Sequence, residues 1–385
     1  MNDTTPAPDG ADLFGTGALE PDETEGPLEP DDDAARPGAR SMTLSIAMLV
    51  AAVLFAVLAV VPAPYVVSSP GPTRDTLGDQ GGTPLISISG APTYPSTGQL
   101  RLTTVSATGG PGYPSTVLGV VRGWFDGSSA VRPVEELYPP DASKDEVDKA
   151  NQVQMTSSQE NATVAALEEL GYDVPATLTV AGTTAGSGAD GVLLVDDVLV
   201  TMNGTALTSF TQLTDALKAT TAGATVHLGV ERAGSPIDVD VVTTERKGGG
   251  AQLGVLVKPT FSPPIDVKIK IDDIGGSSAG TMFALGIIDK LTPEDEVNGQ
   301  VVAGTGTMDI SGEVGPIGGI RQKLVGARRD GATWFLAPVD DCAEVVGHVP
   351  DGLRVVRIAT LHEAREAIIA IGAGTADSLP TCTAG

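Results

Sequence analysis

A run of 20 residues without a charge, Met42–Val61, constrains the fold of this 385-residue chain more than any other feature. The run is rich in Ala, Val and Leu, and a helix of this length spans the hydrocarbon core of a bilayer. A cleaved signal peptide is the alternative interpretation. Because the run is longer than a usual signal-peptide core and 40 residues precede it, we expect an uncleaved transmembrane helix over residues 41–62.

Charges on either side of this run predict its orientation. Arg36 and Arg40 precede it, and no charged residue follows until Arg74. Since basic residues favour the cytoplasmic side, we expect a single-pass protein of the cell membrane, with a cytoplasmic N-terminus and residues 63–385 outside. Residues 1–40 hold 11 acidic and 2 basic residues with many Pro and Gly, which predicts a disordered tail.

Composition excludes several classes of function. The formal net charge of −26 argues against nucleic acid as a partner, because phosphate binding needs a basic surface. The three histidines, His227, His348 and His362, lie outside the glycine turns that carry serine, so a Ser-His-Asp triad fits poorly. The sequence has no Cys/His spacing typical of zinc and no phosphate-cradling glycine loop. We therefore expect no metal, no cofactor and no nucleotide-driven motor.

Two glycine turns carry the candidate chemistry, and the first offers a serine. Alternating apolar residues over Ile265–Ile271 predict a strand, the glycines Gly275 and Gly276 permit a sharp turn, and Ala279–Lys290 reads as an apolar helix. Ser278 would lie near a helix N-terminus, where free N–H groups can hold a developing oxyanion. The alternative is that Ser277 or Ser278 only caps the helix.

The second turn, Gly315-Pro316-Ile317-Gly318-Gly319, opens a helix that offers a lysine. Lys323 shares one face with Ile320, Leu324 and Ala327. An apolar setting lowers the pKa of a lysine, and a neutral amine can act as general base to a serine. The alternative is a lysine at the edge of the stripe with its ammonium in water. The serine and the lysine, 45 positions apart, are together stronger than either alone.

The segments Gly276–Gly280, Thr305–Thr307 and Gly315–Lys323 resemble the proteolytic domain of Lon proteases, over roughly residues 260–372. The resemblance implies a Ser–Lys dyad at Ser278 and Lys323, with Thr305 supporting the lysine. It also implies an α+β fold like that of the second domain of ribosomal protein S5. Ser277 departs from the pattern, since Lon usually has proline there, but the following Ala-Gly favours Ser278 as nucleophile. Classical Lon carries an ATPase, for which this sequence shows no signature.

Residues 63–172 suggest no chemistry of their own. Strands are expected at Leu85–Ile88 and Gln99–Val105, an apolar stretch covers Val117–Phe125, and Asp145–Leu170 reads as a helix with a break near Ser157-Ser158. The order of features from the apolar run through Tyr65–Gly71, Leu102–Val105 and Ser158–Ala162 resembles bacterial membrane-anchored Lon-like proteases of the YlbL type. We expect an extracytoplasmic α+β region.

Residues 173–258 read as a β-rich module. Ala189–Gly204 resembles the centre of a bacterial PDZ domain, and Val226–Glu231 and Ile237–Thr243 would supply closing strands. Such a domain binds an extended chain by strand addition. The alternative is a β-module used as a spacer. The expected groove has its edge strand at about Ala176–Val180, with Leu178 and Val180, and its helix at Phe210–Lys218, with Phe210, Leu213 and Leu217 on one face.

Two cysteines remain, Cys342 and Cys382. An even pair outside the membrane can be oxidised, and a bridge would attach the tail at residues 373–385 to the preceding domain. Two free thiols are the alternative.

The sequence thus predicts an α+β protein: tail (1–40), transmembrane helix (41–62), α+β region (63–172), PDZ-like domain (173–258), Lon-like proteolytic domain (259–372) and C-terminal tail (373–385). The expected function is ATP-independent serine endopeptidase activity on unfolded or flexible protein segments, with the PDZ-like module capturing or gating substrate. Assembly into a homo-oligomeric ring is a further expectation. Two alternatives are a catalytically silent PDZ scaffold at the membrane and an enzyme that uses the same dyad on esters rather than peptides.

Overall fold

The structure is a computed structural model that describes residues 39–246, 249–272 and 274–383. It divides into two compact units, with the boundary between Phe55 and Ala56. Helix α1 (Ala39–Val60) accounts for the described part of the first unit. The predicted disordered tail lies outside the described residues, except for Ala39 and Arg40, which begin α1.

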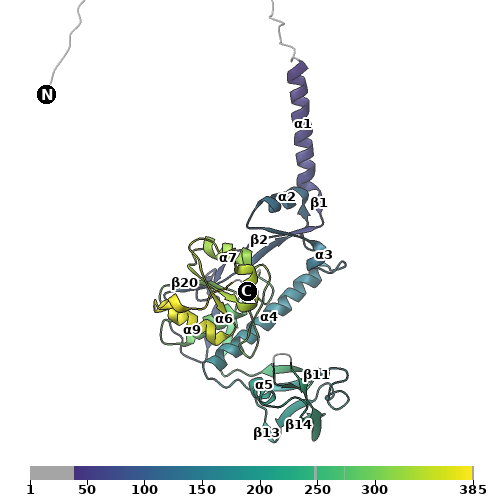
Figure 1. Ribbon diagram of the computed structural model, residues 1–385, viewed down its shortest axis with the longest axis vertical. Helices are drawn as coiled ribbons and strands as arrows, with labels where there is room; N and C mark the ends of the chain where they lie inside the picture. Colours follow the sequence, from purple (N-terminus) through teal and green to yellow (C-terminus); the bar gives the residue numbers. More distant parts are fainter. Residues whose placement is uncertain (1–38, 247–248, 273, 384–385) are drawn as a thin grey trace, which may run out of the picture. The chain divides into compact units, whose positions relative to one another are not determined.

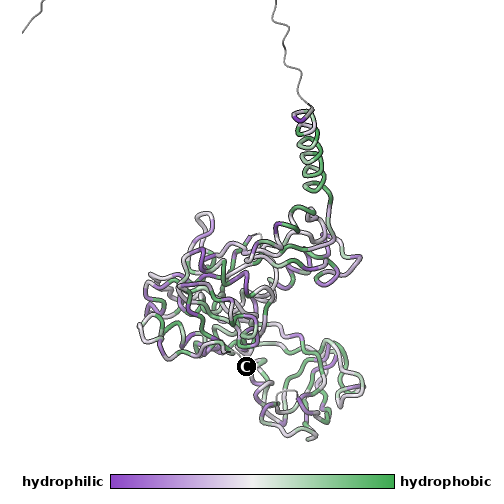
Figure 2. Tube along the Cα trace, turned by 45° about the horizontal axis from the view of Figure 1, so that its top comes forward, coloured by the Kyte–Doolittle hydropathy of each residue, from purple (hydrophilic) through white to green (hydrophobic). Residues whose placement is uncertain are grey.

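Helix α1 is apolar along nearly its whole length (Figure 2). Within the described residues it is the one helix whose length and composition suit a membrane crossing, over Arg40–Val60. A signal sequence near the N-terminus has the same properties. The predicted apolar helix is therefore present, and both interpretations of it fit the structure.

The second unit contains an α/β domain whose elements come from both ends of the chain (Figure 1). Its N-terminal elements are β1 (Pro62–Ala63), β2 (Tyr65–Pro70), β3 (Arg74–Asp75), β4 (Asp79–Gln80), β5 (Thr83–Pro84), β6 (Ile86–Ser89), β7 (Gln99–Leu102), β8 (Val105–Thr108), β9 (Ser115–Thr116), α2 (Val117–Phe125), β10 (Ala130–Pro133), α3 (Val134–Leu137) and α4 (Lys144–Glu169). Its C-terminal elements are β19 (Asp266–Ile269), α6 (Gly280–Leu291), β20 (Val301–Gly304), β21 (Thr307–Met308), β22 (Val314–Gly315), α7 (Ile320–Arg329), β23 (Trp334–Pro338), α8 (Cys342–Val345), β24 (Arg354–Ile358) and α9 (Leu361–Gly372), with 3-10 turns at Val339–Asp341 and Ala376–Ser378.

The central sheet of this domain has the strand order β24-β23-β20-β7-β3. Strand β7 lies between β20 and β3, with Leu100 paired to Val302 in parallel register. A second link joins β19 to β6. The expected division into a region at 63–172 and a domain at 259–372 is therefore wrong, because one sheet needs strands from both. Leu100 and Leu102 are fully buried, so β7 could not stand on its own in water.

Alternate residues of the central strands face two apolar cores. Val302 and Leu336 pack with residues of α6 and α9, whereas Ala303 and Phe335 pack with residues of α7. Because side chains alternate along a strand, neighbouring residues enter opposite cores. Helices thus cover both faces of the sheet, as is usual for parallel strands (Figure 1).

Helix α4 runs without interruption, so the predicted break near Ser157-Ser158 is wrong. Ser143 and Glu146 form a capping box at its start. Ser158 is buried, and its hydroxyl donates a hydrogen bond of 3.1 Å to the carbonyl of Ser277. The hydroxyl is satisfied outside its own helix and does not compete with the helical backbone there.

Between α4 and β19 the chain forms the PDZ-like region. Its elements are β11 (Ala176–Thr183), β12 (Val198–Met202), β13 (Thr205–Ala206), α5 (Phe210–Lys218), β14 (Thr225–Arg232), β15 (Ser235–Val242), β16 (Thr244–Glu245), β17 (Ala251–Gln252) and β18 (Val255–Phe261). The main sheet has the order β15-β14-β12-β11-β18. Helix α5 and the two closing strands lie where the sequence predicted them.

The predicted edge strand of this region is wrong. Strand β11 is an inner strand, paired on one side with β12 and on the other with β18. Leu178 and Val180 are fully buried in the core of the region. Strand β18, with Val255 and Val257, occupies the edge instead, and within the described residues β11 is its only partner.

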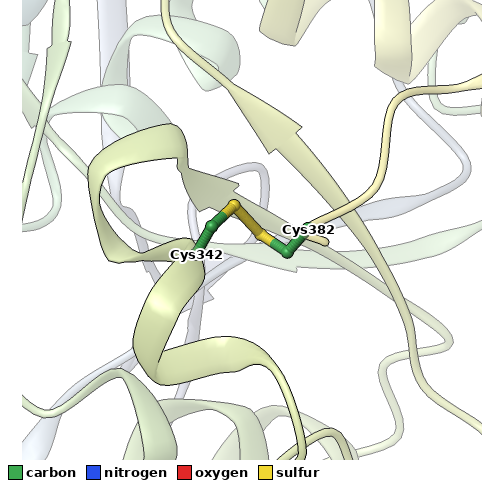
Figure 3. Close-up of a disulfide and its surroundings, with 2 residues drawn as sticks. All are labelled: Cys342 and Cys382. Carbon is green, nitrogen blue, oxygen red and sulfur yellow. A yellow bond between two sulfur atoms is a disulfide. The ribbon is translucent and has the colours of Figure 1, made fainter. Parts of the chain in front are cut away.

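A disulfide joins Cys342 on α8 to Cys382 in the C-terminal segment (Figure 3). The carbonyl of Pro380 accepts a hydrogen bond of 3.0 Å from the N–H of Arg357 on β24. Cys382 also packs against the core that α7 shares with the sheet. The described part of the predicted tail is therefore attached to the domain, and residues 384–385 lie outside the described range.

Candidate active site

Ser278 lies in the turn between β19 and α6, and helix α4 holds this turn from one side. Gly276 has a φ of +88°, a conformation that favours glycine, and its N–H donates to the carbonyl of Asn151 at 3.1 Å. Ser158 donates to Ser277, as described above. Asn151 and Ser158 of α4 thus fix the two residues that precede the serine, although the sequence of this region had suggested no chemistry.

The carbonyl of Ser278 is fixed from the other side. It accepts hydrogen bonds of 3.0 Å from the N–H of Gly306 and from the hydroxyl of Thr305. Thr305 directly follows β20 and is fully buried. The serine is therefore tied to the carboxyl end of a central strand, where a rigid scaffold positions it.

Lys323 is brought to the serine by α7. Gly319, with a φ of +71°, makes the turn that starts this helix. The Nζ atom of Lys323 donates at 2.8 Å to Ser278 Oγ and at 2.8 Å to Thr305 Oγ1. The structure thus brings together all three residues that the sequence singled out at this site.

The lysine amine is almost completely withdrawn from water, with 2% of the residue exposed. This burial lowers the pKa of Lys323 to about 7, while the negative charge of Asp341 acts in the opposite direction. A neutral amine is thus accessible near neutral pH.

The sequence did not identify Asp341 as a residue of this site. It is buried, and its carboxylate accepts a hydrogen bond of 3.1 Å from the N–H of Ile317, in the turn before α7. Burial raises the pKa of Asp341, and this hydrogen bond opposes the rise. One carboxylate thus holds the turn that presents Lys323 and also acts on its charge. In the sequence, Asp341 is notable only as the neighbour of Cys342, and that position does not indicate a contact with the turn before α7.

Two cavities meet at Ser278. The first, of about 510 Å³, is lined by Ser278 and Lys323. Its other lining residues include Asp272, residues 274–276, Ala279, Pro72, Arg74 and residues 103–107. The second, of about 430 Å³, is lined by residues 276–278, Thr307 and residues 316–318. An extended chain could therefore lie across the serine with one end in each cavity.

Donors for an oxyanion were expected at the start of the serine helix. Helix α6 begins at Gly280, with Ala279 as its N-cap residue. In the described part of the chain, the N–H groups of Ser278 and Ala279 have no backbone acceptor outside regular elements. They are available to a negative oxygen formed next to Ser278 Oγ.

The predicted groove of the PDZ-like region is present but is built differently. A cavity of about 750 Å³ is lined by Phe210, Leu213 and Leu217 of α5 and by residues 252–257 at the start of β18. Leu178 and Val180 do not line it. Gly254, with a φ of +73°, lies in the turn that leads into β18. A glycine before the alternating run Val255–Phe261 could have indicated a strand at this position, although not its place at the edge of the sheet.

The described residues contain no group of three or more His, Cys, Asp or Glu side chains that could hold a metal ion. The chemistry available at the site is that of a hydroxyl, an amine with a lowered pKa and backbone donors. This set suits acyl transfer through a covalent intermediate.

Residues 268–370 match the family model described as Lon protease (S16) C-terminal proteolytic domain. Lon protease 1 of Bacillus subtilis is 31% identical over 117 residues, which cover 29% of this chain and 15% of the relative. Lon protease 2 of Herpetosiphon aurantiacus is 36% identical over 106 residues, which cover 26% and 13%. The chain thus spans only about a seventh of the length of these relatives.

Among solved structures, the PDZ domain of an SdrC-like protein from Listeria monocytogenes is similar to part of this chain. The identity is 21%, the match covers 21% of this chain and 86% of the PDZ domain, and the TM-score is 0.20. A second PDZ domain, from Listeria innocua, matches with 20% identity and the same TM-score.

Proposed function

We propose that this protein is a serine endopeptidase in which Ser278 is the nucleophile and Lys323 the general base. One observation carries the proposal: a buried lysine amine, with a pKa near 7, lies 2.8 Å from the serine hydroxyl. The match of residues 268–370 to a proteolytic domain supports peptide bonds as the target.

In the proposed mechanism, neutral Lys323 accepts the hydroxyl proton while Ser278 Oγ attacks the scissile carbonyl carbon. The N–H groups of Ser278 and Ala279 would hold the resulting oxyanion. Collapse of the tetrahedral intermediate breaks the C–N bond, and the leaving amine takes the proton from Lys323. A water molecule then attacks the acyl-enzyme, with Lys323 accepting its proton. The bond between the acyl carbon and Ser278 Oγ breaks, and Lys323 returns the proton to Oγ, which releases the new carboxyl terminus. The hydroxyl of Thr305 donates to the carbonyl of Ser278 and accepts from Nζ of Lys323, and so keeps the amine directed at Ser278 Oγ.

Proteolysis by this chain is expected to be independent of ATP. Its sequence shows no phosphate-cradling loop, and its similarity to Lon proteases covers the proteolytic domain alone. Without a motor to unfold substrates, the enzyme would act on flexible segments or unfolded chains. The cavity between α5 and β18 suits capture of such a chain by strand addition, because one edge of β18 has no partner among the described strands.

Helix α1 is proposed as an uncleaved membrane anchor with the catalytic unit outside the cytoplasm. Protease treatment of intact cells stripped of their wall should then digest the C-terminal part and spare the N-terminus. Digestion of the N-terminus alone would reverse this orientation.

Cleavage of casein by the purified full-length chain in detergent tests the enzymatic proposal. We expect cleavage without ATP, no stimulation by ATP, and none by folded Ser278→Ala protein. Peptide binding without any cleavage would favour the silent scaffold, and cleavage of small esters but not of peptides would favour the esterase alternative. Equal cleavage by Ser278→Ala would refute Ser278 as nucleophile.

A further inference from the structure

One charged side chain lines the first cavity without any role in the proposed mechanism. Arg74, on strand β3, shares this cavity with Ser278 and Lys323. Its strand pairs with β7, where Arg74 lies opposite Leu102, so the sheet fixes its backbone. Arg74 thus lies on a strand of the central sheet and lines the same cavity as Ser278.

Among the arginines of the described residues, Arg74 is the one with a buried side-chain nitrogen that has no hydrogen-bond partner. In the described part of the chain it forms no hydrogen bond or ion pair through its side chain, and its Nε is buried without an acceptor. By contrast, Nε of Arg101 donates to Thr73, that of Arg232 to Asp197 and that of Arg365 to Glu296, at 2.7 to 3.0 Å. A buried donor without an acceptor is costly, which favours an external ligand that supplies one.

We propose that Arg74 binds the carboxylate of an acidic side chain in the substrate, and so makes the enzyme selective for Glu or Asp on one side of the scissile bond. This inference rests on the proposed proteolytic function. A carboxylate matches the guanidinium because it can accept from Nε and from a terminal nitrogen at once. The bound substrate would thereby satisfy the donor that the folded chain leaves unpaired.

The charges around the two cavities make the selectivity one-sided. Apart from Arg74, the described residues that line the first cavity include two ionisable groups, Lys323 and Asp272. Lys323 is hydrogen-bonded to Ser278 and Thr305, and Asp272 is exposed and makes no ion pair with Arg74. The second cavity is lined only by uncharged residues. An acidic residue is therefore favoured in the first cavity and gains nothing in the second.

Mapping of cleavage sites tests this one-sidedness. The full-length protein in detergent would digest a library of peptides with amidated C-termini, and mass spectrometry would locate each cut. We expect Glu and Asp to be enriched at one position on one side of the cut. Matched peptides with Glu or Gln at that position should then differ about ten- to a hundredfold in kcat/KM. Equal kcat/KM values for the Glu and Gln peptides, or no enrichment of acidic residues at any position, would contradict a side-chain subsite.

Variants of Arg74 test its role directly through the Glu/Gln selectivity ratio. Arg74→Gln should reduce this ratio to about one. Arg74→Lys should give an intermediate ratio, because the positive charge remains but the paired donors of the guanidinium are lost. Arg74→Glu should shift the preference to peptides with Lys at the same position. Arg357→Gln, which removes an exposed arginine on β24 outside both cavities, is the matched control and should keep the wild-type ratio. An unchanged ratio in folded Arg74→Gln protein would overturn the inference.

A binding assay separates this inference from the proposed function. Fluorescence anisotropy of the labelled Glu and Gln peptides would be measured on full-length Ser278→Ala protein, with and without Arg74→Gln. Tighter binding of the Glu peptide that Arg74→Gln abolishes would support the subsite even if no cleavage occurred. Equal binding of both peptides would refute it, even if the wild-type protein proved to be a protease.

Discussion

The cleft at the candidate active site and the groove of the PDZ-like region are both suited to an extended chain, but they are built in opposite ways. The cleft contains the buried amine of Lys323. It combines residues that lie far apart in the sequence: Pro72, Arg74, residues 103–107, Asp272, residues 274–276, Ser278, Ala279, Gly318 and Lys323. The groove is formed mostly by residues 184–257, with an apolar helix face and the start of a strand. The cleft thus depends on single side chains, whereas the groove depends on backbone and on a shared apolar surface.

This difference predicts that single substitutions in the cleft have the larger effects. Lys323→Arg keeps the charge but cannot lose its proton, so activity should fall by about 10³-fold or more, as for Ser278→Ala. The double variant should be little worse than either single one, because the two residues act as a unit. Casein cleavage by proteins shown to be folded measures all three. Ser277→Ala is the matched control and should retain substantial activity, since that side chain only shapes the turn.

The pH dependence of kcat/KM tests whether the buried amine of Lys323 acts as the base. Lys323 is charged below its pKa of about 7 and neutral above it, so the rate should rise with pH and level off above neutrality. Asp341 raises this pKa, and Asp341→Asn should therefore shift the profile to lower pH. Kinetics on one short peptide from pH 5 to 9 would measure the shift. A profile that moves to higher pH, or that falls as the pH rises, would contradict Lys323 as the base.

The smallest effects are expected in the groove. Leu217→Arg places a charge on the α5 face that lines it, and should raise KM for a long unfolded substrate about three- to tenfold by weakening strand addition. The rate on a short peptide should change much less. Asp215→Arg, on the exposed side of the same helix, is the control. Equal losses on long and short substrates would mean that the groove takes no part in capture.

The same contrast explains which features the sequence could predict. The glycine turns before Ser278 and Lys323 are chemically specific, because few other combinations place a hydroxyl and an apolar-face lysine at two helix starts. For the groove, both Ala176–Val180 and Val255–Phe261 alternate as strands do, and alternation does not tell an inner strand from an edge strand. Only the pairing of β11 with both neighbours decides between them.

The sequence also did not predict which residues from distant segments contact the candidate active site. Arg74, Asn151, Ser158 and Asp341 contact or flank the site from segments that give no local sign of it. The break expected at Ser157-Ser158 shows the reason. Two neighbouring serines favour a helix break when their hydroxyls bond to the nearby backbone. Ser158 instead donates to Ser277, 119 positions away, and the local sequence gives no sign of that acceptor.

The position of β7 between β20 and β3 determines the order in which the regions of a newly made chain can fold. Synthesis makes β7 early, but its neighbour β20 appears only after the whole PDZ-like region has been made. The PDZ-like region has its own core and can fold during that interval. A chain that stops before Val301 therefore carries a groove for binding but no assembled cleft. The interleaved sheet thereby makes assembly of the candidate active site conditional on synthesis of β20 and the elements that follow it.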